Sequence, residues 1–374
     1  MTTMIENDTL HLKSRQVAEE ILANLKKDVG VDLLPIFLDT TRDARELRRE
    51  AATRLFEALV ARAQNSNDAA EWTGSDEGVL RAFAADVDVE PNMIYTEENL
   101  KTLKGMRGQE IYDYLYSLTK RFEAMSKATS PGQLALQIIG AGLLSVSVPM
   151  AIGTIQALRV AGTTVAAALR AGIANIGMKT AVLAIAVALT TLIWWLIHDN
   201  PKKILGLVIN ETDEHLVVRN WRAGTEGGTG ADLYMAHGDM KSFPQDYEEG
   251  VLAKKIQINK RAYFGPGDKE NACYAGIFFA EKKTGFYGTE GIIVFSSTEG
   301  TPRFAQVFAC PYTKDNGTAG RVLNGWPDVQ KLFDDLYDKR QVNFSTKEHG
   351  HEFVSSVNDA RGGVAACISS FRKA

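Results

Sequence analysis

The residues of this chain that could do chemistry are a histidine pair and the cysteines. His349 and His351 in EHGHE are two residues apart, so on a strand both imidazoles would face one side and could bind a metal ion. No third ligand at a recognisable spacing accompanies them. Cys273 or Cys310 could pair with a distant histidine as a thiol nucleophile, but neither lies in a local catalytic motif. Burial as a small apolar side chain is the more common role of such cysteines.

The remaining patterns also give no sign of catalysis. The segment GTEGGTGAD is rich in glycine but has no strand–GxGxxG–helix context and no P-loop lysine, so we interpret it as a surface turn. The three cysteines (Cys273, Cys310 and Cys367) are odd in number and irregular in spacing, which argues against a disulfide framework. We therefore predict a protein that is not an enzyme and has no cofactor and no metal.

Aromatic residues concentrate instead in segments that are predicted to be turns. Tyrosine and tryptophan suit a membrane interface, because one end of the side chain is apolar and the other forms hydrogen bonds. The alternative is that most of these side chains pack inside the domain. The residues are Trp221, Tyr263, Phe264, Phe286, Tyr287, Tyr312 and Trp326, with Tyr337 on a predicted helix.

Residues 1–130 are predicted to form a bundle of amphipathic helices. Apolar residues recur at helical spacing after Ser14, which can cap the first helix, and again in RDARELRREAATRLFEALVARAQN. Ser75 or Asp76 can begin a short helix through Phe83. Thr96, followed by two glutamates, can begin another helix, and GQEIYDYLYSLTKRFEAMSK continues with one apolar face. The apolar stripes of these helices are expected to form a core.

Residues 131–200 are predicted to form a long apolar helical hairpin that inserts into membranes. No Asp or Glu occurs from Ala124 to His198, and Thr180–Ile197 is a run of eighteen uncharged residues. As a helix this run would be about 27 Å long, close to the ~30 Å hydrocarbon core of a bilayer. Arg159, Arg170 and Lys179 would lie in the linker between helices 134–158 and 180–197. The residues expected to enter the membrane are Leu143, Leu144, Val148, Ile152, Ile155, Leu183, Ile185, Val187, Leu189, Leu192, Trp194 and Trp195.

Residues 201–374 are predicted to form a β-sandwich with one helix. Short runs rich in β-branched and aromatic residues, such as ILGLVIN, CYAGIFFAE, GIIVFSS and RFAQVFACPY, are separated by turn signals. PDVQKLFDDLYDKR interrupts them with helical spacing. The predicted fold class is thus a two-part α+β protein: an N-terminal helical bundle with an apolar hairpin, followed by a C-terminal β-sandwich that binds a membrane or a glycan.

The segment YAGIFFAEKKTGFYGTEGIIVFSSTEGTPRFAQVFACPYTKDN, followed by a tryptophan and a helix ending LFDDLYD, resembles the actinoporin-like β-sandwich of sea-anemone cytolysins and related fungal lectins. The resemblance implies a pocket for phosphocholine headgroups, with sphingomyelin preferred. Tyr312 and Tyr337 would then hold the quaternary ammonium through cation–π contacts, beside Pro311, Trp326 and Phe333. In composition, residues 134–197 are also similar to the apolar hairpin of α-helical pore-forming toxins such as the cytolysin A group.

These patterns together predict a pore-forming or membrane-permeabilising toxin. It would bind the target bilayer through the sandwich, insert the hairpin and form a homo-oligomer there. The net charge of −4 gives no reason to expect nucleic-acid binding. The N-terminus has no secretory signal, so we expect a protein that is soluble before release and leaves the cell by a non-classical route. Two alternatives remain open: a constitutive two-span membrane protein, and a lectin-like binding module whose hairpin stays buried.

Overall fold

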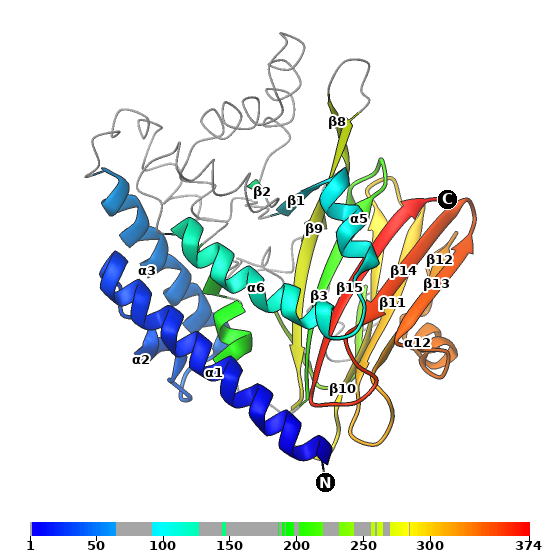
Figure 1. The fold of residues 1–374 in the computed structure, drawn as a ribbon. Helices are drawn as coiled ribbons and strands as arrows, with labels where there is room; N and C mark the ends of the chain where they lie inside the picture. Colours follow the sequence, from blue (N-terminus) through cyan, green and yellow to red (C-terminus); the bar gives the residue numbers. More distant parts are fainter. Residues whose placement is uncertain are drawn as a thin grey trace.

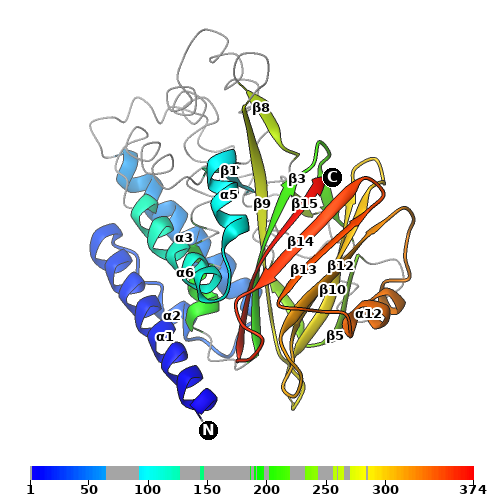
Figure 2. The ribbon, with the colours of Figure 1, turned by 45° about the vertical axis from the view of Figure 1, so that its right-hand side comes forward.

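The computed structural model describes residues 2–64, 92–126, 144–146, 186, 189–190, 192–197, 202–219, 232–242, 256–258, 260–264, 270–283 and 285–374. Figure 1 shows a layer of helices on one side of two packed β-sheets, with a single further helix on the opposite side. The turned view in Figure 2 shows the same order of layers. The fold is therefore α+β with a mostly β C-terminal part, as the sequence predicts.

The helical layer confirms the predicted N-terminal helices where the structure describes them, whereas the short helix predicted through Phe83 lies outside the described residues. Its members are α1 (Thr2–Val29), α2 (Leu34–Phe37), α3 (Ala44–Gln64), α5 (Glu97–Gly105) and α6 (Gln109–Ser126). Their apolar stripes are buried together, including Ile21 and Leu25 of α1, Leu55 of α3, and Ile111 and Leu115 of α6. The stripes are buried because the layer packs against the outer face of the first sheet, to which α3, α5 and α6 all make contact.

Within the described residues, the first sheet has nine strands and the second has six. The order in the first sheet is β13-β14-β15-β3-β9-β1-β2, with β6 and β8 also paired to β9. The order in the second sheet is β12-β11-β10-β4-β7, with β5 paired to β10. The strands are β1 (Asn92–Thr96), β2 (Leu144–Val146), β3 (Lys203–Glu211), β4 (Leu216–Val218), β5 (Leu233–His237), β6 (Asp239–Ser242), β7 (Ile256–Ile258), β8 (Ala262–Phe264), β9 (Glu270–Glu281), β10 (Thr289–Ser297), β11 (Arg303–Cys310), β12 (Gly317–Leu323), β13 (Asn343–Glu348), β14 (His351–Val357) and β15 (Val364–Lys373).

Aromatic rings fill the space between the two sheets. Phe278 of the first sheet lies 5.2 Å from Phe308 of the second, measured between ring centroids, and Phe371 lies 4.6 Å from Phe304. The central strand β3 is buried along Lys203–Asn210 on both faces, since the helical layer covers its outer face. Such two-sided burial requires a nearly continuous apolar run, which is what KILGLVIN supplies.

Helix α12 (Val329–Tyr337) covers the outer face of the second sheet. Leu332, Phe333 and Leu336 pack against Ile292 and Val307, which point away from the space between the sheets. Asp328 caps the helix by accepting a hydrogen bond from the backbone N–H of Lys331 at 3.1 Å. The helix predicted for PDVQKLFDDLYDKR is therefore confirmed.

The structure corrects the predicted apolar hairpin where it describes that region. Leu144–Val146 forms strand β2, which pairs with β1, instead of continuing a helix through 134–158. β1 pairs with β9, so it adds a segment of the N-terminal region to the first sheet. Residues 192–197 are helical and lie between the helical layer and the first sheet. No long apolar helical hairpin is present in the described part of the chain.

Candidate functional site

Two loops at the same end of the sandwich bring aromatic residues together. Thr289 and Cys310 pair across β10 and β11, so the residues before Thr289 and after Cys310 lie side by side. Gly288 permits this approach, because a Cβ atom there would lie 2.6 Å from the Cα of Pro311. The β9–β10 and β11–β12 loops thus present their aromatic side chains from one end of the molecule. These side chains are Phe286, Tyr287 and Tyr312.

All three rings are exposed to a degree that a packing role does not explain. The exposed fraction is 95% for Phe286, 67% for Tyr287 and 43% for Tyr312. Tyr287 is held by stacking on His237, with 4.3 Å between the ring centroids. Neighbouring exposed rings are typical of a surface that binds a partner or a membrane.

Three lysines lie close to the exposed aromatic rings of these two loops. The Nζ of Lys282 donates a hydrogen bond to the hydroxyl of Tyr312 at 2.8 Å. The Nζ atoms of Lys202 and Lys282 each lie 5.3 Å from the centroid of the Tyr312 ring. Lys283 is exposed next to them. We call Phe286, Tyr287, Tyr312, Lys202, Lys282 and Lys283 the aromatic tip.

The other residues of the expected headgroup pocket are distributed around α12. Phe333 is buried, and its ring lies 5.6 Å from that of Tyr234 and 5.0 Å from that of Tyr337. The guanidinium of Arg340 lies 3.7 Å from the centroid of the Tyr337 ring, and the Nζ of Lys314 lies 4.8 Å from it. Burial raises the pKa of the Tyr337 phenol above its ordinary value.

This arrangement differs from a single aromatic cage. Among the described residues, the rings of Tyr312 and Tyr337 do not contact each other, and each already lies beside cations of the chain. A quaternary ammonium would have to displace those cations, whereas a phosphate group would be attracted by them. Pro311 is buried next to the aromatic tip. Headgroup binding by these five predicted residues stays a prediction.

Trp326 lies at the opposite end of β11 from Tyr312, with its ring 3.8 Å from the guanidinium of Arg303 and 58% exposed. Arg303 is buried, and its Nε atom has no hydrogen-bond partner among the described residues. Burial raises the pKa of the nearby Asp232 carboxyl to about 6. One oxygen of Asp232 accepts a hydrogen bond from the backbone N–H of Arg219 at 2.8 Å. Trp326 therefore belongs to a second, polar site and not to the aromatic tip.

The described residues of the predicted insertion segment are buried in this conformation. Leu189, Leu192, Trp194 and Trp195 are each at most 1% exposed. The ring of Trp194 lies 5.6 Å from that of Phe37, measured between centroids. Leu144 lies in β2. The predicted insertion residues Leu143, Val148, Ile152, Ile155, Leu183, Ile185 and Val187, and the linker residues Arg159, Arg170 and Lys179, lie outside the described residues.

No helix in the described part of the chain combines the length and the apolar character that crossing a bilayer requires. The Nζ of Lys203 donates a hydrogen bond to the carbonyl oxygen of Trp195 at 2.5 Å, which ties the end of the buried helix to the start of β3. Trp194 and Trp195, which were predicted to enter the membrane, therefore contribute here to the core between the helices and the first sheet.

The residues considered for catalysis are not assembled into a site. His349 lies in the turn before β14 with a φ of 51°, and its carbonyl oxygen is 3.0 Å from the Nδ1 of His351. No group of three or more His, Cys, Asp or Glu side chains in the described residues is placed to hold a metal ion. Burial raises the pKa of Cys310 and of Cys367 to about 12, which disfavours the nucleophilic thiolate.

No protein-family model matches the chain, and no curated protein matches it in sequence. Among solved structures, the lipid-binding protein Nakanori is similar over 46% of this chain and 72% of its own length, with 13% identity and a TM-score of 0.32. The lectin XCL from Xerocomus chrysenteron is similar over 46% of this chain and 98% of its own, with 14% identity and a TM-score of 0.23. IP-1A from Alcaligenes faecalis has 11% identity and a TM-score of 0.27, over 46% of this chain and 92% of its own. Likenesses at these TM-scores assign neither family nor function.

Proposed function

We propose that this protein binds lipid bilayers by docking the aromatic tip into the interface between headgroups and acyl chains. The observation that carries the proposal is the exposure of Phe286, Tyr287 and Tyr312 side by side at one end of the sandwich. Exposed apolar rings in water gain about 1.5–3 kcal/mol each when they are fully buried. Tyrosines also keep their hydroxyl groups in the headgroup layer, where water and phosphate oxygens can accept hydrogen bonds.

The lysines of the aromatic tip favour the phosphate groups of lipids. Lys202 and Lys282 flank the Tyr312 ring and Lys283 is exposed beside them, so the tip carries three positive charges near its aromatic side chains. A basic residue near an anionic membrane surface contributes about 1 kcal/mol of attraction. We therefore expect the protein to bind anionic bilayers more strongly than neutral ones. The competing outcome is stronger binding to bilayers with sphingomyelin or phosphocholine headgroups, which the family resemblance implies.

The finer part of the proposal is that the apolar segment of residues 131–200 then inserts and permeabilises the target membrane, as a homo-oligomer. The described part of the buried helix reaches Ile197, and four residues separate Ile197 from Lys202 in the aromatic tip. Five residue steps span at most about 18 Å, so docking of the tip would bring the end of the apolar segment to the bilayer surface. In that toxin role the protein would be soluble before release by a non-classical route.

Flotation with liposomes tests binding, and dye release from the same liposomes tests permeabilisation. Protein purified without detergent is mixed with vesicles of phosphatidylcholine and cholesterol, alone or with either phosphatidylserine or sphingomyelin. We expect flotation that is strongest with phosphatidylserine, together with release of the trapped dye. Flotation without release would remove the insertion step and keep membrane binding. A protein that floats with none of the three compositions would refute the proposal.

The geometry around Trp326 supports a second candidate function, glycan binding. Its ring is exposed on one side and lies on Arg303 on the other, and the guanidinium of Arg219 lies 5.6 Å from its centroid. An exposed indole can stack on the apolar face of a sugar, and the Arg219 guanidinium can donate hydrogen bonds to its hydroxyls. A glycan array tests this function, and binding that Trp326→Ala abolishes without loss of flotation would support it.

A further inference from the structure

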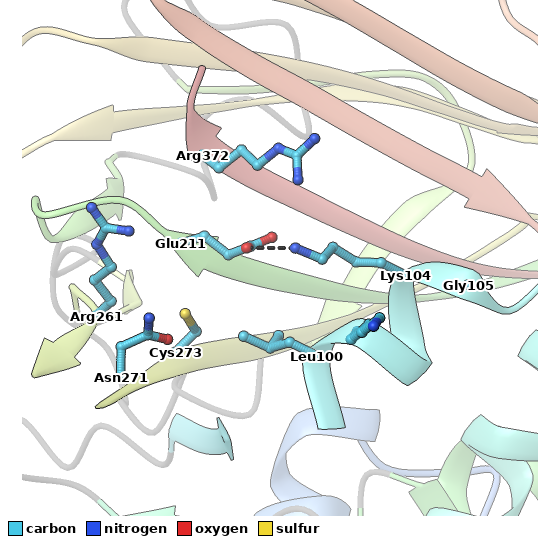
Figure 3. Close-up of a pocket in the computed structure, with 9 residues that line it drawn as sticks. Leu100, Lys104, Gly105, Glu211, Arg261, Asn271, Cys273 and Arg372 are labelled. Carbon is cyan, nitrogen blue, oxygen red and sulfur yellow. Dashed lines mark hydrogen bonds and ion pairs between the residues drawn. The ribbon is translucent and has the colours of Figure 1, made fainter. Parts of the chain in front are cut away.

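A cavity of about 570 Å³ lies between α5 and the upper ends of three strands in the first sheet, at the opposite end of the sandwich from the aromatic tip. The residues that line the cavity belong to α5, the end of β3, the segment before β8, β9 and β15, as Figure 3 shows. The volume falls in the range of about 300–1,000 Å³ that is usual for small-molecule sites. Neither the sequence patterns nor the proposed membrane function accounts for it.

Most of the charged side chains that line this cavity directly are basic. Lys101, Lys104, Arg261 and Arg372 line it against a single carboxylate, that of Glu211. The Nζ of Lys104 lies 2.7 Å from a Glu211 oxygen, and this ion pair joins α5 to β3. Figure 3 shows this pair among the lining residues, with Arg261 beside Glu211 and Arg372 above the pair in this view.

Two further carboxylates bind the arginines. Asp213 accepts hydrogen bonds from the Nε and Nη2 of Arg261 at 2.7 and 2.9 Å, and Glu352 accepts one from the Nε of Arg372 at 2.5 Å. With these included, four cations face three carboxylates. Lys101 is exposed and has no ion-pair partner among the described residues. These charges leave a net charge of +1 at the cavity, which favours an anionic ligand.

We propose that the cavity binds a small organic phosphate of about the size of a sugar phosphate. A phosphate monoester accepts several charge-assisted hydrogen bonds at once, which suits two guanidinium groups and two ammonium groups around one space. The ligand phosphate would bind Lys101 and share Lys104 with Glu211. Its polar body would fill the remaining volume beside Asn271.

The position of the cavity favours a soluble ligand over a membrane lipid. Glu211 ends β3 and Lys203 begins it, so at about 3.3 Å per residue the cavity is roughly 26 Å from the aromatic tip. A bilayer docked at the tip would not reach it. Because the two lysines belong to α5 and the other cations to the sandwich, the bound phosphate would tie the helical layer to the first sheet. This inference does not depend on membrane binding.

Titration calorimetry of the full chain with glucose 6-phosphate tests the site, with glucose as the uncharged probe. We expect one site for glucose 6-phosphate and none for glucose.

Lys101→Ala should weaken binding of glucose 6-phosphate about tenfold, which corresponds to ~1.4 kcal/mol. Glu211→Gln should tighten binding, because it removes the carboxylate that competes for Lys104. Lys331→Ala, on the exposed side of α12, is the matched control and should change nothing. Equal affinity in Lys101→Ala and Lys331→Ala, or no binding at all, would overturn the proposal.

Cys273 provides an independent test of where the ligand binds. It lines the cavity and is 2% exposed, and Cys310 and Cys367, which lie away from the cavity, are also buried and have raised pKa values. We expect glucose 6-phosphate to slow alkylation of Cys273 by iodoacetamide in the wild type, as measured by mass spectrometry. An unchanged alkylation rate at saturating ligand would place the ligand elsewhere and overturn the proposal.

The ligand phosphate could belong to a soluble molecule or to a lipid headgroup. Flotation with vesicles that contain phosphatidylinositol 4-phosphate distinguishes these two sources. If the ligand is soluble, as we propose, Lys101→Ala leaves flotation with these vesicles unchanged. Flotation that Lys101→Ala abolishes would overturn the soluble source in favour of a lipid headgroup.

Discussion

Phe286→Ala isolates the apolar contribution of the aromatic tip to membrane binding. The side chain is 95% exposed, and none of its atoms takes part in the described hydrogen bonds or ring contacts, so the substitution should leave the free energy of unfolding unchanged within about 0.5 kcal/mol. Any loss of vesicle binding then reports on the membrane-bound state alone.

The expected loss follows from the exposed fraction. Full burial of a phenylalanine side chain gains about 1.5–3 kcal/mol, and nearly all of the Phe286 side chain is available for burial. At ~1.36 kcal/mol per factor of ten, its removal should lower the vesicle partition coefficient by roughly 10- to 150-fold. The measurement is flotation across a series of lipid concentrations at one salt concentration.

Leu38→Ala is the matched control, because Leu38 is another large apolar side chain that is exposed, at 49%, but it lies after α2 in the helical layer. We expect it to bind vesicles as the wild type does. Two results would contradict docking through the aromatic tip: a loss of vesicle binding below about twofold for Phe286→Ala, or an equal loss for Leu38→Ala. Either result would mean that specific burial of the Phe286 ring supplies little of the binding free energy.

Three further substitutions test other parts of the structure. Gly206→Ala should lower the free energy of unfolding by about 1–3 kcal/mol in a urea titration, since its Cβ would lie 2.0 Å from the Phe278 ring, whereas Gly325→Ala, with nothing within 4 Å, should change it little. Asp232→Asn should stabilise the protein above pH 6 and not at pH 4. The folded-state pKa of Asp232 is raised from 3.8 to about 6, so the native state binds the proton more tightly and loses stability as pH rises through this window. Lys282→Gln should weaken flotation with phosphatidylserine vesicles about fivefold at low salt and less at 1 M salt.

Much of the fold follows from local patterns in the sequence. The apolar runs predict β3, β9, β10 and β11, because strands that are buried on both faces have few polar positions, mostly near their ends. Helix α12 is predicted by apolar residues at helical spacing. Phe286 and Tyr287 were identifiable as aromatic residues in a turn, since glycines precede and follow them.

The rest depends on contacts between distant segments. Strand β13 reads NFSTKE and alternates between exposed and half-buried residues at a sheet edge, so it has no apolar signal. Strand β1 lies in the helical part of the sequence and is stabilised by pairing with β9, far along the chain. Lys101 and Lys104 look like ordinary surface charges of a helix, and only the packing of α5 on the sheet makes them part of a cavity.

The buried position of the apolar helix predicts how permeabilisation should depend on protein concentration. Eight apolar residues within 186–197 are buried in the core, and their combined contribution is on the order of 10–20 kcal/mol, comparable with the 5–15 kcal/mol stability of a whole domain. Burial of the helix in the bilayer would supply a comparable free energy for the helix itself. However, its departure would expose the surfaces of Phe37, Tyr112 and the first sheet to water. Neighbouring copies can cover these surfaces, so insertion should be cooperative. The initial rate of dye release should therefore rise with a power of bound protein clearly above one, and a strictly linear dependence would contradict insertion as an oligomer.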